Sequence, residues 1–275
     1  MMICGFLFSS FDVSAKEVVV LPDNQVIQGE PVRFELKGTE FRNVKRFVFD
    51  GKEYLMTKLK NRAVVFVGID IKKTPGVYRG DFVLKNGTVV SKEITVLERP
   101  RLTETFQIPK SLGGNTKKAA LNVVSNLTKE NILLDTLKSE PTTLWKKSFR
   151  YPLDNVTVTD VYGYSRDTSS VVVTHKGTDF RALQGTKVFA MNDGVIALAE
   201  SLTVYGNTVV IDHGAGLKTF YMHLSKMNVV VGQKVRQGDL LGLSGQTGYS
   251  LAPHLHLTVR LQNISIDPIV FMSLF

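Results

Sequence analysis

Cysteine and histidine are scarce in this sequence of 275 residues, and each scarcity narrows the range of chemistry. The only cysteine, Cys4, cannot form a disulfide within the chain. This fits either a cytosolic protein or a secreted protein that relies on its hydrophobic core. Residues 1–174 contain no histidine, so all five histidines lie in the last 101 residues. Their clustering is a first indication that the C-terminal part carries metal or proton-transfer chemistry.

Long apolar runs and long basic runs are also missing. The mean hydropathy of +0.03 argues against a protein with several membrane spans, and the apolar fraction of 43% is typical of a globular protein. The length allows one large domain or two of ordinary size. The formal charge of +9 is spread along the chain. It favours an anionic partner, such as nucleic acid, acidic lipid or a phosphate-bearing wall polymer, but a generally basic soluble protein explains it equally well.

The N-terminus carries a short apolar run, Ile3 to Phe8, followed by the small-residue sequence VSA at residues 13–15. This order is typical of the end of a secretory signal, although no Lys or Arg precedes the apolar run. The run is too short to span a bilayer. We interpret residues 1–16 as the remnant of a signal peptide and expect export, with a mature chain that starts near Lys16 and has no transmembrane span. The alternative is a frayed apolar terminus.

Residues 17–98 read as short strands separated by turns. Apolar and polar residues alternate over residues 32–37, which is the period of a half-buried strand. Asp-Gly at residues 50–51 and Asn-Gly at 86–87 are hairpin signals, because both turn positions need positive φ. The pattern predicts a small immunoglobulin-like β-sandwich without the cysteine pair of antibody domains. It holds no catalytic constellation, so we expect a binding or positioning module.

Residues 99–148 are expected to form a partly helical linker. Apolar residues recur every three or four positions over residues 120–137, and Asn115 or Thr116 is placed to cap the start of a helix. One or two helices would therefore bridge two β modules. Trp145, the only tryptophan, is expected to pack this linker onto a neighbouring domain.

Residues 149–275 contain many short strand patterns, Gly-rich turns and no clear helical period. This part is predicted to be an antiparallel β-sheet domain of the barrel or sandwich type. The whole chain is thus predicted to be mainly β, with a small sandwich, a helical linker and a C-terminal β domain.

Two histidines in the C-terminal part, His254 and His256, are one residue apart on a predicted strand, so they share a face. A solvated pair on an exposed face is the alternative, but the surrounding apolar residues argue against it. His175 and Asp179 are four residues apart across a turn, which alone could be a surface ion pair. Together with one of the two strand histidines they suit a tetrahedral zinc site with one open position, although iron is not excluded. Zinc would lower the pKa of a bound water to about 7.

His223 ends a predicted strand, and Tyr221 is expected to lie on the same face of that strand as His223. Near a zinc-bound water this histidine could act as a general base or stabilise a developing oxyanion, whereas a lone strand-end histidine is often a structural hydrogen-bonding residue. His213, which precedes Gly214, is expected to be structural and to close a strand into a turn.

The C-terminal half resembles the lysostaphin-type (LytM-like) zinc endopeptidases that cut peptidoglycan peptides. The resemblance covers roughly residues 149–270 and consists of short segments in the same order. These segments are His175–Phe180, Asn192–Ile196, Tyr205–Asn207, Val210–Gly214, Tyr221–Ser225, Val231–Val235, Gln237–Asp239, Gly245–Gly248 and Pro253–His256.

The resemblance implies that His175, Asp179 and His256 are the zinc ligands, and that His223 and His254 are the catalytic pair. Spacing alone would let either strand histidine bind the metal. All five positions are intact, whereas some members of the family have lost ligands and only regulate other hydrolases.

The resemblance also concerns four positions near these residues, namely Arg166, Leu251, Leu257 and Thr258. Arg166 ends a Gly-x-x-Arg stretch often found before the first ligand in this family, and it could meet a substrate carboxylate or form a structural salt bridge. Leu251 stands where the family commonly has a small residue, and Leu257-Thr258 replace an aromatic-acidic pair. These changes concern substrate preference more than the metal.

The resemblance predicts an exported, zinc-dependent endopeptidase of bacterial cell-wall peptidoglycan, located in the periplasm or cell envelope. Its partners would be peptidoglycan peptides and not nucleic acid, and we expect a monomer. The alternative is a non-catalytic peptidoglycan-binding protein or an activator of other wall hydrolases. A carrier of the lipoyl or biotin type, or a sugar-transport module, is a third interpretation, but the lysine hairpin that such a carrier needs is missing.

Overall fold

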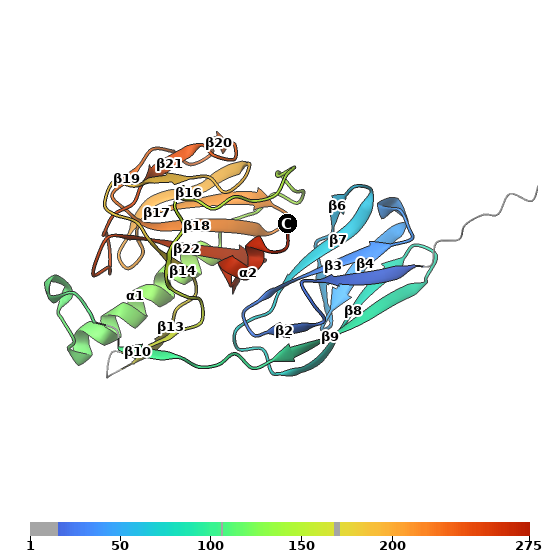
Figure 1. Cartoon of the computed structure of the whole chain (residues 1–275), viewed down its shortest axis with the longest axis horizontal. Helices are drawn as coiled ribbons and strands as arrows, with labels where there is room; N and C mark the ends of the chain where they lie inside the picture. Colours follow the sequence, from blue (N-terminus) through green and yellow to red (C-terminus); the bar gives the residue numbers. More distant parts are fainter. Residues whose placement is uncertain (1–15, 106, 168–170) are drawn as a thin grey trace, which may run out of the picture.

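The computed structural model describes residues 16–105, 107–167 and 171–275, which form two β-rich parts joined by a linker with one long helix (Figure 1). The predicted mainly-β fold class is therefore confirmed. The interpretation of residues 1–16 as a signal remnant falls almost wholly outside the described residues. Within the described parts, we find no helix with the length and apolar character needed to cross a membrane.

Two sheets make up the N-terminal part, and their facing side chains form one hydrophobic core. The first sheet has the order β1-β3-β7-β6 and the second β2-β9-β8-β4-β5. Their strands are β1 (Glu17–Leu21), β2 (Gln25–Ile27), β3 (Pro31–Lys37), β4 (Val44–Phe49), β5 (Lys52–Tyr54), β6 (Thr57–Leu59), β7 (Arg62–Gly68), β8 (Gly76–Leu84) and β9 (Val89–Leu97), with a 3-10 turn η1 (Phe41–Asn43) before β4.

The alternation seen in the sequence places the side chains of β3. Val32, Phe34 and Leu36 are fully buried, because a strand directs every second side chain to the same face. Asp50 and Gly51 turn β4 into β5 with φ of 50° and 72°. At the β8–β9 turn Gly87 has a positive φ of 86°, whereas Asn86 does not, so that turn differs from the expected type.

The linker holds strand β10 (Thr103–Thr105), the 3-10 turn η2 (Lys110–Leu112) and helix α1 (Lys117–Asp135). Thr116 caps the helix, since its side chain accepts a hydrogen bond from the backbone N–H of Ala119 at 3.2 Å. Trp145 is buried against Phe66 of the sandwich and against Phe149 and Phe275, which is the packing expected for it.

The C-terminal part contains one large sheet of the order β11-β14-β22-β18-β17-β16-β20, with β23 also paired to β22, and a smaller sheet β15-β21-β19. β12 and β13 form a hairpin that pairs in parallel with β10 of the linker. The elements are β11 (Val158–Asp160), β12 (Ser165–Asp167), β13 (Val172–Thr174), β14 (Thr178–Arg181), β15 (Lys187–Phe189), β16 (Gly194–Leu202), β17 (Gly206–Gly214), β18 (Leu217–Leu224), β19 (Lys226–Met227), β20 (Lys234–Val235), β21 (Leu240–Leu243), β22 (His254–Leu261), β23 (Ile264–Ile266) and α2 (Pro268–Met272).

The short helix α2 departs from the expectation that the C-terminal part holds no helix. Asp267 caps its start by accepting hydrogen bonds from Ile269 N and Val270 N, and Pro268 occupies the first turn. The sequence signal for it was therefore present as an Asp-Pro pair.

The two faces of the large sheet are covered differently. One face packs into the main core, to which β22 contributes Leu255, Leu257 and Val259. The other face is covered by α1, whose Leu134 packs against Phe220 and Met222 of β18 (Figure 1). By strand alternation the polar residues of β22 lie on the face that α1 covers.

The two β-rich parts touch directly. Val64 and Phe66 of the sandwich belong to the main core of the C-terminal part, and Asp267 N donates a hydrogen bond of 2.7 Å to Gly29 O. Arg99 lies between them, 3.4 Å from the Asp267 carboxylate. The boundaries 17–98, 99–148 and 149–275 stay a prediction.

Candidate metal centre

Strand pairing brings two of the candidate ligands together. β14 pairs antiparallel with β22 so that Asp179 lies directly opposite His256. His175 stands just before β14, and the chain between them passes very close to β22. A Cβ atom at Gly177 would be 2.4 Å from His256 Nε2 and 2.6 Å from Leu257 O, so the turn requires glycine for lack of space.

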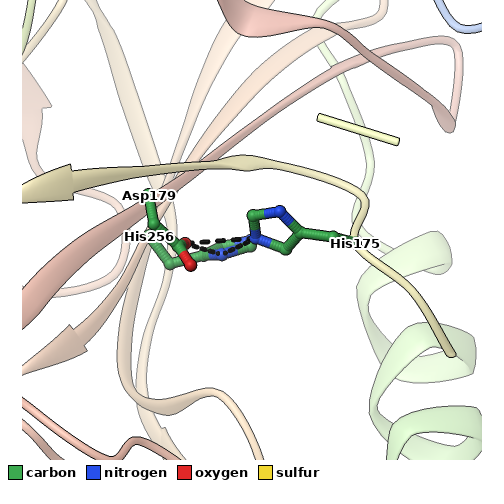
Figure 2. Close-up of side chains that lie close together, drawn as sticks. All are labelled: His175, Asp179 and His256. Carbon is green, nitrogen blue, oxygen red and sulfur yellow. Dashed lines mark hydrogen bonds and ion pairs between the residues drawn. The ribbon is translucent and has the colours of Figure 1, made fainter. Parts of the chain in front are cut away.

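The side chains of His175, Asp179 and His256 converge on one point (Figure 2). His175 Nε2 lies 3.1 Å from Asp179 Oδ1 and 3.0 Å from His256 Nδ1, and His256 Nδ1 lies 2.6 Å from the same Oδ1. All three residues are buried. A single point lies about 2.1 Å from the three atoms, which is the length of a zinc bond to nitrogen or oxygen.

Hydrogen bonds on the far side of each imidazole determine where its proton is. His175 Nδ1 donates to Val161 O at 3.0 Å, which leaves a lone pair on Nε2. The hydroxyl of Thr258 donates to Lys176 O at 3.1 Å and accepts from His256 Nε2 at 3.0 Å. His256 therefore keeps its lone pair on Nδ1. Both rings thus present an acceptor nitrogen to the shared point.

Hydrogen bonds also orient the carboxylate of Asp179. Arg166 donates a hydrogen bond of 2.6 Å to Asp179 Oδ2 and one of 3.1 Å to Asp160, which leaves Asp179 Oδ1 directed at the histidines. In these tautomers the neutral rings and the carboxylate present three acceptor atoms to one another. Such a set repels itself unless a cation lies at its centre, so the donor set fits a metal ion.

The local electrostatics keep Asp179 and His256 in the forms that bind metals. Burial raises the pKa of the Asp179 carboxyl, but the positive charge that His175 and His256 carry in acid outweighs burial and holds this pKa well below its usual range. Burial lowers the pKa of His256 to about 4, so its ring is neutral at pH 7. A carboxylate and neutral imidazoles are the forms in which these side chains bind metals.

His223 and His254 stand beside the cluster, with ring centroids 4.9 Å apart. His223 Nδ1 donates to Thr247 O and His254 Nδ1 donates to Ala252 O, both at 2.8 Å, so each ring has its lone pair on Nε2. His254 Nε2 lies 3.8 Å from Asp179 Oδ1. Burial and the neighbouring histidine rings lower the pKa of His223 to about 3, so its ring is neutral at pH 7.

The expectation that His223 shares a strand face with Tyr221 is wrong. Tyr221 packs in the main core, whereas the His223 ring lies against His254 and His256. The cause is a φ of 60° at His223, which interrupts the strand alternation.

His213 is fully buried away from these residues. Its Nδ1 donates to Asp193 O at 2.8 Å, and its Nε2 is hydrogen-bonded to Thr219 Oγ1 at 2.8 Å. Burial lowers its pKa to about 4. These contacts fit the structural role expected for it.

The structure thus gathers all five candidate residues, and it adds two that the sequence left open. Arg166 forms salt bridges with Asp160 and Asp179, which favours the structural alternative for this arginine. Thr258 supports His256 directly, although its position indicated only substrate preference. A hydroxyl two residues after a strand ligand is the signal that could have pointed to this contact.

Comparison with known proteins shows which family the C-terminal part resembles. The family model described as Peptidase family M23 matches residues 173–268. The peptidoglycan DD-endopeptidase ShyA of Vibrio cholerae is 48% identical over 85 residues, which cover 31% of this chain and 20% of that protein. The glycyl-glycine endopeptidase ALE-1 of Staphylococcus capitis is 43% identical over 106 residues, or 36% of this chain and 29% of that protein.

One solved structure extends the likeness beyond this region. A putative peptidase M23 from Pseudomonas aeruginosa has a TM-score of 0.66 and 24% identity, and the match covers 90% of this chain and 95% of that one, which shows a shared fold. The chain spans between 20% and 29% of the length of eight curated relatives that it matches. The resemblance seen in the sequence is confirmed: the C-terminal part of this chain is a domain of peptidase family M23.

Proposed function

We propose that this chain is an exported zinc endopeptidase that hydrolyses peptide bonds in bacterial cell-wall peptidoglycan, in the periplasm or cell envelope. The observation that carries the proposal is the convergence of two buried imidazole nitrogens and a buried carboxylate oxygen beside two further histidines. The names of the matched relatives, which include peptidoglycan endopeptidases, support the substrate class.

His175, Asp179 and His256 would hold the metal. Two histidines and a carboxylate are a ligand set that leaves one position of a tetrahedral zinc site open for catalysis. When bound, zinc lowers the pKa of water to about 7 and polarises a carbonyl oxygen. Their burial keeps bulk water away from the ligands and strengthens electrostatic interactions there.

His223 and His254 would move the protons. Each has its Nδ1–H engaged by a backbone carbonyl, so Nε2 is the atom that can accept a proton from the attacking water. Once protonated, the same nitrogen can donate to the leaving amine or stabilise negative charge on the carbonyl oxygen. The carbonyl partners hold both rings in the tautomer that this role needs.

The test compares His256→Ala with His254→Ala, two changes only two residues apart on β22. Each purified protein is analysed for zinc and incubated with peptidoglycan. We expect His256→Ala to lose the metal and the activity, and His254→Ala to keep the metal and lose turnover. Because the two sites lie on one strand, each variant controls for general damage to β22 in the other.

Two results would end the proposal. One is a wild-type protein that binds no zinc. The other is normal digestion of peptidoglycan by both variants. A wild-type protein that binds zinc and peptidoglycan without cutting it would instead support the non-catalytic alternative.

A further inference from the structure

A cavity of about 490 Å³ lies between helix α1 and the metal centre. His175, His223 and His256 line it on the side of the large sheet. The helix lines it from the other side with one continuous face, formed by Val123, Val124, Leu127, Thr128, Asn131 and Ile132. The family model covers only residues 173–268, so α1 lies outside the family domain.

Charged contacts fix the position of α1 over this cavity. The carboxylate of Glu130 accepts hydrogen bonds from Val204 N at 2.8 Å and Tyr205 N at 3.1 Å, in the turn between β16 and β17. One turn further along, Asp135 accepts a hydrogen bond of 2.8 Å from Arg260 of β22. Glu130 and Arg260 are buried, whereas Asp135 is half-exposed. Breaking the contacts of a buried charge is costly, so these contacts hold α1 against the large sheet.

The N-terminal half of α1 bridges the two loops that flank the centre. Its buried residues Ala120 and Val123 pack in one cluster with Val171, which precedes β13, and with Tyr249, which lies in the loop before β22. The helix therefore reaches from one side of the centre to the other.

Both apolar and positively charged side chains line the cavity. Val172 and Val173 of β13 line it together with the apolar residues of α1, and Lys72 and Lys176 line it with exposed ammonium groups. Arg166 and Arg260, which also line it, are already paired with carboxylates. Apolar surfaces suit small aliphatic side chains, and exposed lysines suit a carboxylate.

We propose that α1 is one wall of the substrate cleft, and that the cleft takes a peptide segment with small aliphatic side chains and a free carboxylate. This inference rests on the proposed function, because it concerns the same centre. On this inference, α1 and the family domain together determine which peptide the cleft accepts. Lys72 would extend that role to the N-terminal sandwich, because it comes from the segment between β7 and β8.

The test uses a bulky substitution on α1 to narrow the cleft. Thr128 is exposed and lines the cavity, so Thr128→Trp places an indole in it without touching the core or the candidate catalytic residues. Leu121→Trp is the matched control, because Leu121 is 50% exposed on the same helix and does not line the cavity. The probe is a soluble cross-linked stem-peptide dimer released from peptidoglycan by a muramidase. Its hydrolysis and its equilibrium binding are both measured.

We expect Thr128→Trp to raise KM and weaken binding by roughly tenfold or more, because an overfilled site excludes the peptide. The value of kcat should stay within about twofold, since the change removes uniform binding only. Leu121→Trp should match the wild type. Equal KM and binding for the two variants would overturn the inference.

The binding measurement separates the two proposals. If the wild type binds the dimer without cutting it, the proposed function fails, and weaker binding by Thr128→Trp still supports the wall. If the wild type neither cuts nor binds the dimer, both proposals are wrong.

Discussion

Thr258 offers the sharpest test of how the metal centre is organised. Its hydroxyl is the acceptor for His256 Nε2 and the donor to Lys176 O, at 3.0 and 3.1 Å. The residue is only 3% exposed, so bulk water has little access to the hydroxyl. Thr258→Val keeps the shape of the side chain and removes both hydrogen bonds.

The size of the effect follows from these contacts. Without the hydroxyl, the Nε2–H of His256 is a buried donor with no acceptor, which costs about 1–3 kcal/mol. The ring can avoid that cost by moving its proton to Nδ1, which lies 2.6 Å from Asp179 Oδ1. The proton then occupies the position that the metal needs. We expect zinc affinity to fall roughly 10- to 100-fold, or about 1.4 to 2.7 kcal/mol.

The assay is competition for zinc between the protein and a chromophoric chelator at pH 7. Thr258→Ser is the control, because it keeps the hydroxyl and loses only a methyl group. The urea unfolding of each metal-free protein shows whether the fold is intact. If Thr258→Val binds zinc as tightly as Thr258→Ser, the hydroxyl does not orient His256 and the reasoning is refuted.

Three further predictions concern the surroundings of the centre. Gly177→Ala should abolish zinc binding, because its Cβ would lie 2.4 Å from His256 Nε2. Gly185→Ala has open space around it but a φ of 88°, so it should lose some stability and still bind zinc in the same titration. Arg166→Gln should weaken zinc binding roughly 10- to 100-fold in that titration, because one Asp179 oxygen loses its cationic partner. Burial lowers the pKa of His213 to about 4, so between pH 6.5 and pH 4 only the unfolded chain takes up this proton. Urea unfolding should therefore show that the free energy of unfolding falls by about 3 kcal/mol over that range. The variant His213→Gln should lack this loss.

Much of the fold could be predicted because strand patterns are local. Val32, Phe34 and Leu36 alternate with polar residues and are fully buried, as the two-residue period requires. The same rule fails at His223, where a φ of 60° turns the ring away from the face of Tyr221. That conformation depends on contacts with the neighbouring turn, since His223 N donates to Tyr205 O, and the sequence of the strand does not encode it.

The candidate site could be predicted as a set of residues but not as an arrangement. Spacing puts His254 and His256 on one face and leaves open which of them meets the carboxylate. The pairing of β14 with β22 decides the matter by placing Asp179 opposite His256, 77 residues away in the chain. A shift of this register by two residues would keep the same side chains on the buried face and would place His254 opposite Asp179, so the hydrophobic alternation of β22 alone does not distinguish the two registers.

Glu130 explains why the contribution of α1 escapes sequence analysis altogether. A glutamate in the middle of an amphipathic helix is expected in solvent, but this one is buried and accepts two backbone N–H groups from the β16–β17 turn. The carbonyls of the same turn accept hydrogen bonds from His223 N and Tyr249 N, so the helix, the turn and the candidate base form one connected unit. Since that unit extends beyond the family domain, substrate preference in this chain should respond to changes on α1 that leave every residue of the metal centre in place.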